Sequence, residues 1–120
     1  MKITLDHFKR FEKQIILKKI GISGQKKILS SNVLVVGVGG LGCPLITYLA
    51  ASGVGKIGIV DFDKIEISNL NRQTLFGTND LGKFKVIQAK KHINKLNKKV
   101  KIVTYKKKLN SKNVKNIFRK

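Results

Sequence analysis

The segment that decides the fold runs from Asn32 to Gly42 and reads NVLVVGVGGLG. Its first half is a short, continuous apolar run rich in valine, which is typical of a strand buried on both faces of a parallel sheet. Its second half has the pattern G-x-G-x-x-G, and residues 41–52 then read as a helix that ends at Gly53. The segment therefore predicts a strand, a glycine-rich loop and a helix in direct succession.

The glycine loop has the spacing of a phosphate-binding turn. Its first glycine permits the tight turn, its second lets the backbone approach a phosphate, and its last lets helix and strand pack closely. The following helix offers unpaired N–H groups to an anion. Asp61, 19 residues after the loop, ends the next predicted strand and can bind ribose hydroxyls, whereas Asp63 suits a turn or capping role as well as ligand binding. The predicted nucleotide-binding residues of this unit are Gly37, Gly39, Gly40, Leu41, Gly42, Asp61 and Asp63.

Hydrophobic periodicity predicts the remaining elements. Apolar residues three and four apart predict helices over 4–19, which Gly21 ends, and over 80–97. Ser23 and Ser111 can cap two shorter helices. The further predicted strands are 56–61 and 100–105, and residues 62–79 read as an ordered loop.

The resulting order is βαβαβα, preceded by N-terminal helices. It predicts an α/β fold with a Rossmann-like parallel sheet, right-handed crossovers and helices on both faces. We divide the chain into an N-terminal helical segment, 1–31, and a nucleotide-binding half-domain, 32–120. The first strand of such a fold is normally central, so its unpaired edge implies that another chain covers it or that these residues are the N-terminal half of an incomplete domain.

Composition narrows the class of protein. The chain has 120 residues and is 42% hydrophobic, which suits a single folded domain. No apolar run approaches the roughly 20 residues that span a bilayer, and residues 1–19 lack a signal-peptide core, so we expect a cytoplasmic protein without a membrane partner. One cysteine excludes a disulfide framework; Cys43 reads as a buried small residue, and His7 and His92 read as surface or interface residues.

The formal net charge of +20 has two interpretations. It can indicate a surface that binds nucleotide or nucleic acid, or a compositional excess of lysine at solvent-facing positions. The basic residues are 23 lysines and 3 arginines, and arginine is the residue suited to bidentate phosphate recognition. The second interpretation is therefore favoured, although residues 81–120 hold 15 basic residues and no acid.

Residues 68–73, with the sequence SNLNRQ, follow the second predicted strand, beside the expected ribose site. They bring Asn69, Arg72 and Gln73 to the ligand-facing end of that strand. A hydride-transfer enzyme has no need of this cluster, whereas an enzyme that uses a triphosphate does, because arginine neutralises charge as pyrophosphate leaves. Lys85, in the next predicted helix, can supply a second cation.

These motifs together resemble the ThiF/MoeB/HesA adenylyltransferases, which are prokaryotic relatives of the ubiquitin-activating enzymes. The residues that carry the resemblance are QIIL at 14–17, the glycine loop, ASGVG at 51–55, DFD at 61–63, SNLNRQ at 68–73 and the step from Gly82 to Lys85. The resemblance covers nearly the whole chain and corresponds to the N-terminal half of a family member.

The resemblance implies a function. Family members bind ATP and Mg²⁺ and adenylate the C-terminal carboxylate of a ubiquitin-like sulfur-carrier protein, in molybdopterin or thiamine-thiazole biosynthesis. By this resemblance the glycine loop holds the phosphates and Asp61 the ribose. Arg72 and Lys85 are the implied catalytic residues, and Asn69 and Gln73 lie beside the triphosphate. No side-chain nucleophile is required, because adenylation needs positioning and charge neutralisation.

The sequence departs from the family pattern at Lys13, where relatives have an arginine that reaches the partner subunit's ATP in a homodimer. Lysine keeps the charge but loses the planar fork. In relatives the Mg²⁺-binding aspartate and the zinc-binding C-x-x-C pairs lie downstream of the residues that match this chain, so we expect no metal ligand here and zinc only if the chain continues. We therefore expect weak activity or none from these 120 residues alone.

Other functions remain open. A tRNA-modifying dehydratase of the same superfamily also adenylates its substrate and would suit the basic C-terminal residues, although 68–76 are more similar to the carrier-activating branch. A non-catalytic nucleic-acid-binding module fits the surplus of lysine, but the sequence offers few arginines and no aromatic stacking platform. A nicotinamide dehydrogenase half-domain would leave the cluster at 68–73 unexplained.

Overall fold

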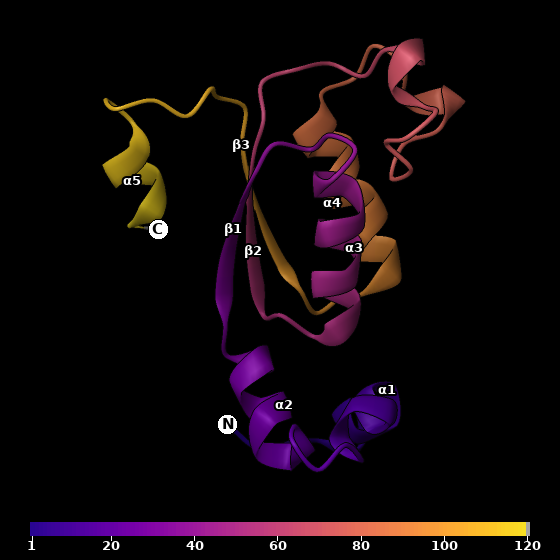
Figure 1. Cartoon of the computed structure of the whole chain (residues 1–120), viewed down its shortest axis with the longest axis vertical. Coiled ribbons are helices and arrows are strands. Elements are labelled where there is room, and N and C mark those ends of the chain that lie inside the picture. Colours follow the sequence, from indigo (N-terminus) through magenta and orange to yellow (C-terminus); the bar gives the residue numbers. More distant parts are fainter. Residues whose placement is uncertain (120) are drawn as a thin grey trace.

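A computed structural model describes residues 1–119 (Figure 1). Three strands, β1 (Asn32–Val36), β2 (Lys56–Val60) and β3 (Lys101–Tyr105), form a parallel sheet in the order β1-β2-β3. The central strand β2 is the most buried, because it has a hydrogen-bonded neighbour on each side. The α/β class and the parallel sheet expected from the sequence are confirmed.

Helices lie on both faces of this sheet. The helices α3 (Gly42–Ser52) and α4 (Lys85–Leu96) cover one face, and α5 (Val114–Phe118) lies over the other (Figure 1). Between α5 and the sheet is a pocket of about 330 Å³, which Tyr105 and Phe118 help to line. The core lies between the sheet and α3 and α4, and its fully buried residues include Cys43, Ile46, Ala50, Ile57, Ile59 and Ala89.

The N-terminal helices α1 (Leu5–Ile15) and α2 (Gly21–Leu29) pack at the end of the sheet where the strands begin (Figure 1). A buried polar cluster, which we call the basal cluster, joins them to the C-terminal end of α3. In it, Gln14 Nε2 donates to Gln25 Oε1 (2.8 Å), and the side chains of both glutamines donate to the carbonyl of Ser52 (3.0 Å each). Asn97 completes the cluster by donating to the carbonyl of Ala50 (3.0 Å).

Three predicted helix boundaries are wrong: the end of α1, the start of α2 and the start of α5. The first helix ends at Ile15, and Gly21, with φ of +58°, begins α2 instead of closing α1. Ser23 lies inside α2, so it does not cap it, and α5 begins after Asn113 instead of being capped by Ser111. Neither serine lies at the point where the chain turns into the helix: α2 begins at Gly21, and Asn113 is the residue before α5.

Helix α4 begins at Lys85, five residues later than the periodicity predicts. The segment 62–84 instead contains two short 3₁₀ turns, η1 (Ile67–Asn69) and η2 (Thr78–Asp80). Backbone hydrogen bonds hold its two ends together: Ile65 N–H donates to Lys83 O and Gly82 N–H donates to Ile65 O, both at 2.9 Å. Because these long-range bonds use backbone groups of Gly82 and Lys83, these residues are not part of α4, and the helix begins at Lys85.

Strand β1 is less buried than the sequence predicts. Val35 is buried, but Val36 is 54% exposed, whereas four of the five residues of β2 are buried. The cause is position: β1 is an edge of the described sheet, and α5 covers only part of the face opposite α3. The prediction that β1 is buried on both faces is therefore wrong for residues 1–119.

Candidate nucleotide-binding site

The glycine loop joins β1 to α3 at the end of the sheet where the strands finish. Gly37 adopts φ of +95°, which side chains disfavour, and its N–H donates to Val60 O (2.7 Å). A Cβ on Gly42 would lie 2.1 Å from the carbonyl oxygen of Gly37, so this contact between helix and strand requires glycine. A Cβ on Gly39 would meet nothing within 4 Å, and Leu41 is 88% exposed, so this part of the loop faces solvent.

Asp61 fastens this loop to the end of β2. Its Oδ2 accepts a hydrogen bond from Val38 N–H, and its Oδ1 accepts one from Asp63 N–H, both at 2.8 Å. The carboxylate is partly exposed, and each oxygen keeps further lone-pair capacity for a hydroxyl donor. Asp63 is exposed and ends 3.9 Å from the ammonium of Lys85.

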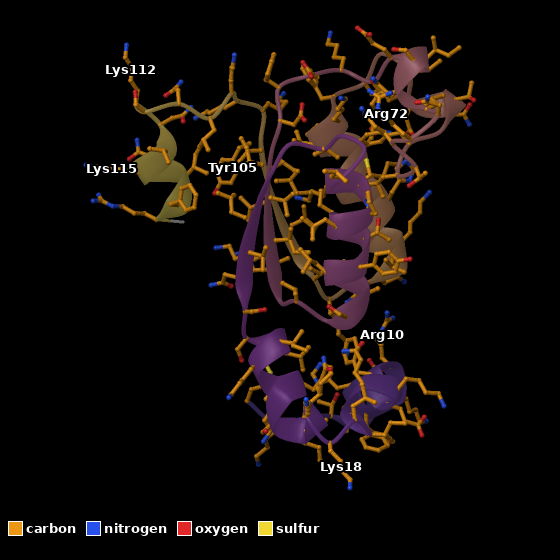
Figure 2. All side chains as sticks on the ribbon, in the orientation of Figure 1. Arg10, Lys18, Arg72, Tyr105, Lys112 and Lys115 are labelled. Carbon is orange, nitrogen blue, oxygen red and sulfur yellow. The ribbon has the colours of Figure 1, made fainter. Side chains whose placement is uncertain are left out.

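Arg72 lies against the glycine loop. A Cβ on Gly40 would be 3.4 Å from Arg72 Cγ and 3.8 Å from its Nε, so the guanidinium and the loop share one side of the sheet (Figure 2). One guanidinium nitrogen donates to Ser68 O (3.1 Å) and Asn71 Oδ1 (3.0 Å). The exposed side chain is therefore oriented by its own loop.

The other polar residues of the 68–73 segment differ in their roles. Asn69 Oδ1 accepts Glu66 N–H (2.8 Å), so this side chain helps to close the turn η1. Gln73 is 3% exposed, and within the described residues its Oε1 is buried without a hydrogen-bond partner. Such an oxygen is costly to bury unless something donates to it.

Lys85 is 6% exposed and is the first residue of α4. Its ammonium lies 3.9 Å from Asp63 Oδ2, which is too long for a hydrogen bond and leaves N–H donors for another anion. Cys43 is fully buried as predicted, and burial raises the pKa of its thiol, so it packs as a small apolar residue.

A pocket of about 120 Å³ adjoins the glycine loop and Asp61. One side of this pocket was not predicted from the sequence: it is formed by Lys107, Lys108 and Leu109, which follow β3. The available signal was topological, since in a parallel sheet every strand delivers the residues after it to the same edge. The residues that line this pocket are Val36, Gly37, Val60, Asp61, Phe62, Asp63, Lys107, Lys108 and Leu109.

Lys13 is the predicted residue that this chain does not bring to the site. It lies on α1, and the neighbouring Gln14 contacts Ser52 at the C-terminal end of α3, whereas the glycine loop precedes the N-terminal end. The 11 residues of α3 separate these ends by about 16 Å. Lys13 therefore cannot reach the glycine loop of its own chain.

His92, expected to be a surface or interface residue, has a partly exposed side chain and a specific partner that the sequence did not indicate. His92 Nε2 lies 2.9 Å from Oδ2 of the buried Asp80, and an ionised carboxylate only accepts, so the histidine donates. Burial raises the pKa of Asp80, but hydrogen bonds from Gly77, Gln88 and His92 outweigh it and lower the pKa to about 2. His7 accepts Thr4 N–H (3.3 Å) and so completes the cap of α1.

Metal-binding clusters and membrane-spanning helices are both absent from residues 1–119. Within that range no three His, Cys, Asp or Glu side chains group closely enough to hold a metal ion. None of the helices described there combines the length and apolar character needed to cross a bilayer.

Known proteins share this arrangement. The ThiF family matches residues 11–120. The adenylyltransferase and sulfurtransferase UBA4 of Saccharomyces cerevisiae (strain ATCC 204508 / S288c) is 46% identical over 118 residues, which are 98% of this chain and 27% of UBA4. The sulfur carrier protein adenylyltransferase of Thermus thermophilus is 41% identical over 119 residues, which are 99% of this chain and 44% of that protein. The chain thus spans less than half the length of these relatives.

Solved structures agree. Escherichia coli MccB crystallised with ATP is 36% identical with a TM-score of 0.71, over 72% of this chain and 26% of MccB. The structure of PaaA is 32% identical with a TM-score of 0.83, over 92% of this chain and 36% of PaaA. The E. coli tRNA dehydratase TcdA, at 23% identity and a TM-score of 0.91 over 99% of this chain and 48% of TcdA, shares the fold. The match over residues 11–120 shows that the chain belongs to the ThiF family, and the glycine loop and its hydrogen bond to Asp61 agree with this.

Proposed function

We propose that this chain is the nucleotide-binding part of an ATP-dependent adenylyltransferase whose substrate is the C-terminal carboxylate of a ubiquitin-like sulfur-carrier protein. The observation that carries the proposal is the approach of Arg72 to the glycine loop, since a Cβ on Gly40 would lie 3.4 Å from Arg72 Cγ and 3.8 Å from its Nε. The names of the UBA4 and Thermus thermophilus relatives support this activity and this kind of partner.

In this proposal each group binds a different part of ATP. The amides of residues 39–42 and the dipole of α3 hold phosphate oxygens, because the amides of Gly37 and Val38 already donate within the fold. Asp61 accepts a ribose hydroxyl while it keeps the loop closed. The pocket beside it takes the nucleoside, with Phe62, 53% exposed, as an apolar wall.

The reaction forms one bond and breaks one. A carboxylate oxygen of the carrier attacks the α-phosphorus, the bond to the bridging oxygen of pyrophosphate breaks, and the electron pair leaves with pyrophosphate. Arg72 and Lys85 offset the negative charge that grows on the phosphate oxygens, and the amide of Gln73 adds a neutral polar contact beside them. Neither cation needs to lose a proton, so the chain needs no general base for this step.

Mg²⁺ is expected to accompany the triphosphate, and when bound it would neutralise phosphate charge. By the resemblance to the family, its protein ligand and any zinc site are proposed to lie downstream of the residues that match this chain. Molybdopterin and thiamine-thiazole biosynthesis are the two proposed pathways. We expect a cytoplasmic location. We also expect a homodimer, because Lys13 cannot reach the glycine loop of its own chain and could act only on the site of a second copy.

Pyrophosphate release tests the proposal. Carrier protein and MgATP should give carrier-dependent pyrophosphate with a version of the protein that is extended downstream, and much less with these 120 residues. A ¹⁵N-labelled sample of the 120-residue chain should show ATP-induced shifts at residues 37–42 and at Asp61, and weaker shifts with NAD. Chemical-shift changes that appear with NAD but not with ATP would contradict the proposal. So would a rate of pyrophosphate release from the 120 residues alone that equals the rate of the extended protein.

A tRNA substrate is the second candidate, and the basic surface after β3 favours it. Lys106, Lys107 and Lys108 are exposed, and Lys106 Nζ lies 4.6 Å from the centre of the Phe84 ring. Pyrophosphate release that depends on tRNA instead of carrier protein would select this function. Oligonucleotide binding that falls steeply with salt, in the absence of ATP binding, would select a nucleic-acid-binding module.

A further inference from the structure

Asp80 connects helix α4 to the loop that bears the proposed triphosphate-binding residues. Its Oδ1 accepts a hydrogen bond from Gln88 Nε2 (2.6 Å), and its Oδ2 accepts bonds from Gly77 N–H (2.8 Å) and His92 Nε2 (2.9 Å). Gln88 and His92 belong to α4, whereas Gly77 and Asp80 itself lie in the segment 62–84, which also carries Arg72 and Gln73. One carboxylate, 5% exposed, therefore bonds to both elements.

These contacts complement a second attachment of α4. At the start of the helix, Lys85 N–H donates to Asp63 O (3.1 Å), which fixes where the helix begins. Gln88 and His92 lie about 4.5 and 10.5 Å further along the axis. The first attachment fixes where α4 begins, and the core packing of Val86, Ala89 and Ile93 holds its axis against the sheet. The bonds to Asp80 add a polar tie between the loop and the face of α4 that carries Gln88 and His92.

The placement of this face of α4 relative to the loop matters because Lys85 is the first residue of the helix. A rotation about the fixed first residue would move the Lys85 ammonium relative to Arg72 and Gln73, although the backbone bond of Lys85 would survive. Lys85, Gln88 and His92 are spaced by three and four residues, so they lie on one face of the helix. That face is turned toward the loop, as the bonds of its last two members show.

We propose that Asp80 is a positioning residue, which holds α4 so that Lys85 meets the same phosphate group as the Arg72 loop. The proposal rests on the proposed ATP site. It differs from a purely structural role in one measurable respect. A structural role lowers stability regardless of Lys85, whereas a positioning role acts on ATP through Lys85 and vanishes when that side chain is removed.

A double-mutant cycle tests the difference. The Kd of MgATP is measured by ¹⁵N chemical-shift titration for the unchanged chain, Asp80→Asn, Lys85→Ala and the double variant. We expect Lys85→Ala to raise the Kd about tenfold and Asp80→Asn about fivefold, with the double variant within about twofold of Lys85→Ala. Asp6→Asn is the matched control, because Asp6 is an exposed carboxylate on α1 that pairs with Lys99, and it should leave the Kd unchanged.

The outcomes separate this proposal from the one on which it rests. If the increase in Kd of the double variant equals the product of the two single-variant increases, the positioning role is wrong and the proposed ATP site is unaffected. A Lys85→Ala variant with an unchanged Kd removes Lys85 from the ATP site, and the positioning role fails with it.

A second substitution covers the case in which Asp80→Asn does not fold. The side chain of His92 is 29% exposed, so it can be changed with less risk to the core. His92→Phe should raise the Kd about twofold to threefold in the unchanged chain and not in Lys85→Ala. His92→Gln, whose amide can donate to the same carboxylate, should restore the Kd, and a failure to restore it would overturn the proposal.

Discussion

The two ends of helix α3 differ in how their buried polar side chains are satisfied. At its C-terminal end, Gln25 is fully buried, and its donor and its acceptor both have partners within 3.0 Å. At its N-terminal end, Gln73 is nearly as buried, yet within residues 1–119 its Oε1 has no partner. Lys85, also buried there, lies 3.9 Å from the carboxylate of Asp63.

The comparison separates polar groups that serve the fold from polar groups that serve a ligand. A buried polar atom without a partner costs about 1–3 kcal/mol, so the unpaired Oε1 of Gln73 beside a loosely paired buried lysine requires a reason. The basal cluster joins helices and is internally complete. The glycine-loop end keeps unused hydrogen-bonding capacity where parallel strands finish, which is where ligands bind in sheets of this type.

The largest effect is expected within the glycine loop, where Gly42 is required by the packing of the fold and Gly39 is expected to serve ATP binding. Gly42→Ala should lower the free energy of unfolding by at least about 3 kcal/mol, because its Cβ would lie 2.1 Å from Gly37 O. Gly39→Ala, whose Cβ meets nothing within 4 Å, should change it by less than about 0.5 kcal/mol and weaken ATP binding. Urea unfolding and ATP titration measure both. Equal destabilisation by the two variants would break the distinction.

The second prediction exchanges a glutamine for a leucine at each end of α3. Gln25→Leu should cost about 2 kcal/mol of unfolding free energy, because Gln14 loses an acceptor and Ser52 O loses a donor. Gln73→Leu removes an unpaired oxygen and should leave stability unchanged or raise it by up to about 1 kcal/mol, while ATP affinity falls. Thermal and urea unfolding give the stabilities. A loss of stability in Gln73→Leu as large as that in Gln25→Leu would end the comparison.

The third prediction concerns acid. The pKa of Asp80 is about 2 in the folded chain against 3.8 for a free side chain, so folding favours the ionised form. Its contribution, about 2 kcal/mol, is complete above pH 5 and is lost as the pH falls from 4 toward 2. Unfolding free energies measured between pH 2 and 6 should therefore rise less steeply with pH in Asp80→Asn. Lys99 also lowers the pKa of Asp6 through a hydrogen bond and its charge, but this carboxylate is exposed, so Asp6→Asn should change the slope much less than Asp80→Asn does.

The smallest effect is expected from the two arginines at opposite ends of α3 (Figure 2). Arg72→Ala should raise the Kd of ATP about tenfold, because a charge-assisted hydrogen bond is lost, and change the unfolding free energy by less than about 0.5 kcal/mol. Arg10→Ala loses the bond from Arg10 to Leu96 O (3.1 Å) and should leave ATP binding unchanged. Equal ATP affinities in the two variants would contradict the assignment of the site.

Local patterns predicted the parts of the fold that depend on near neighbours. The glycine that ends α3 is an example, because Gly53 adopts φ of 100°, a conformation that glycine tolerates best. The approach of Gly42 to Gly37 could be expected from the same few residues. Local patterns failed where distant segments compete, as at the start of α4. They also gave no sign of the partner of His92, which lies 12 residues earlier in the sequence.

The sequence by itself determined the strand, the glycine loop, the helix and the acid that follows them, because backbone conformation and short loops are encoded within a few residues. Only the tertiary structure decided that Arg72 lies on Gly40, that Lys107 and Lys108 border the same pocket, and that Lys13 lies at the far end. These placements depend on packing between elements brought together by the sheet, and on polar groups that satisfy one another across long stretches of chain.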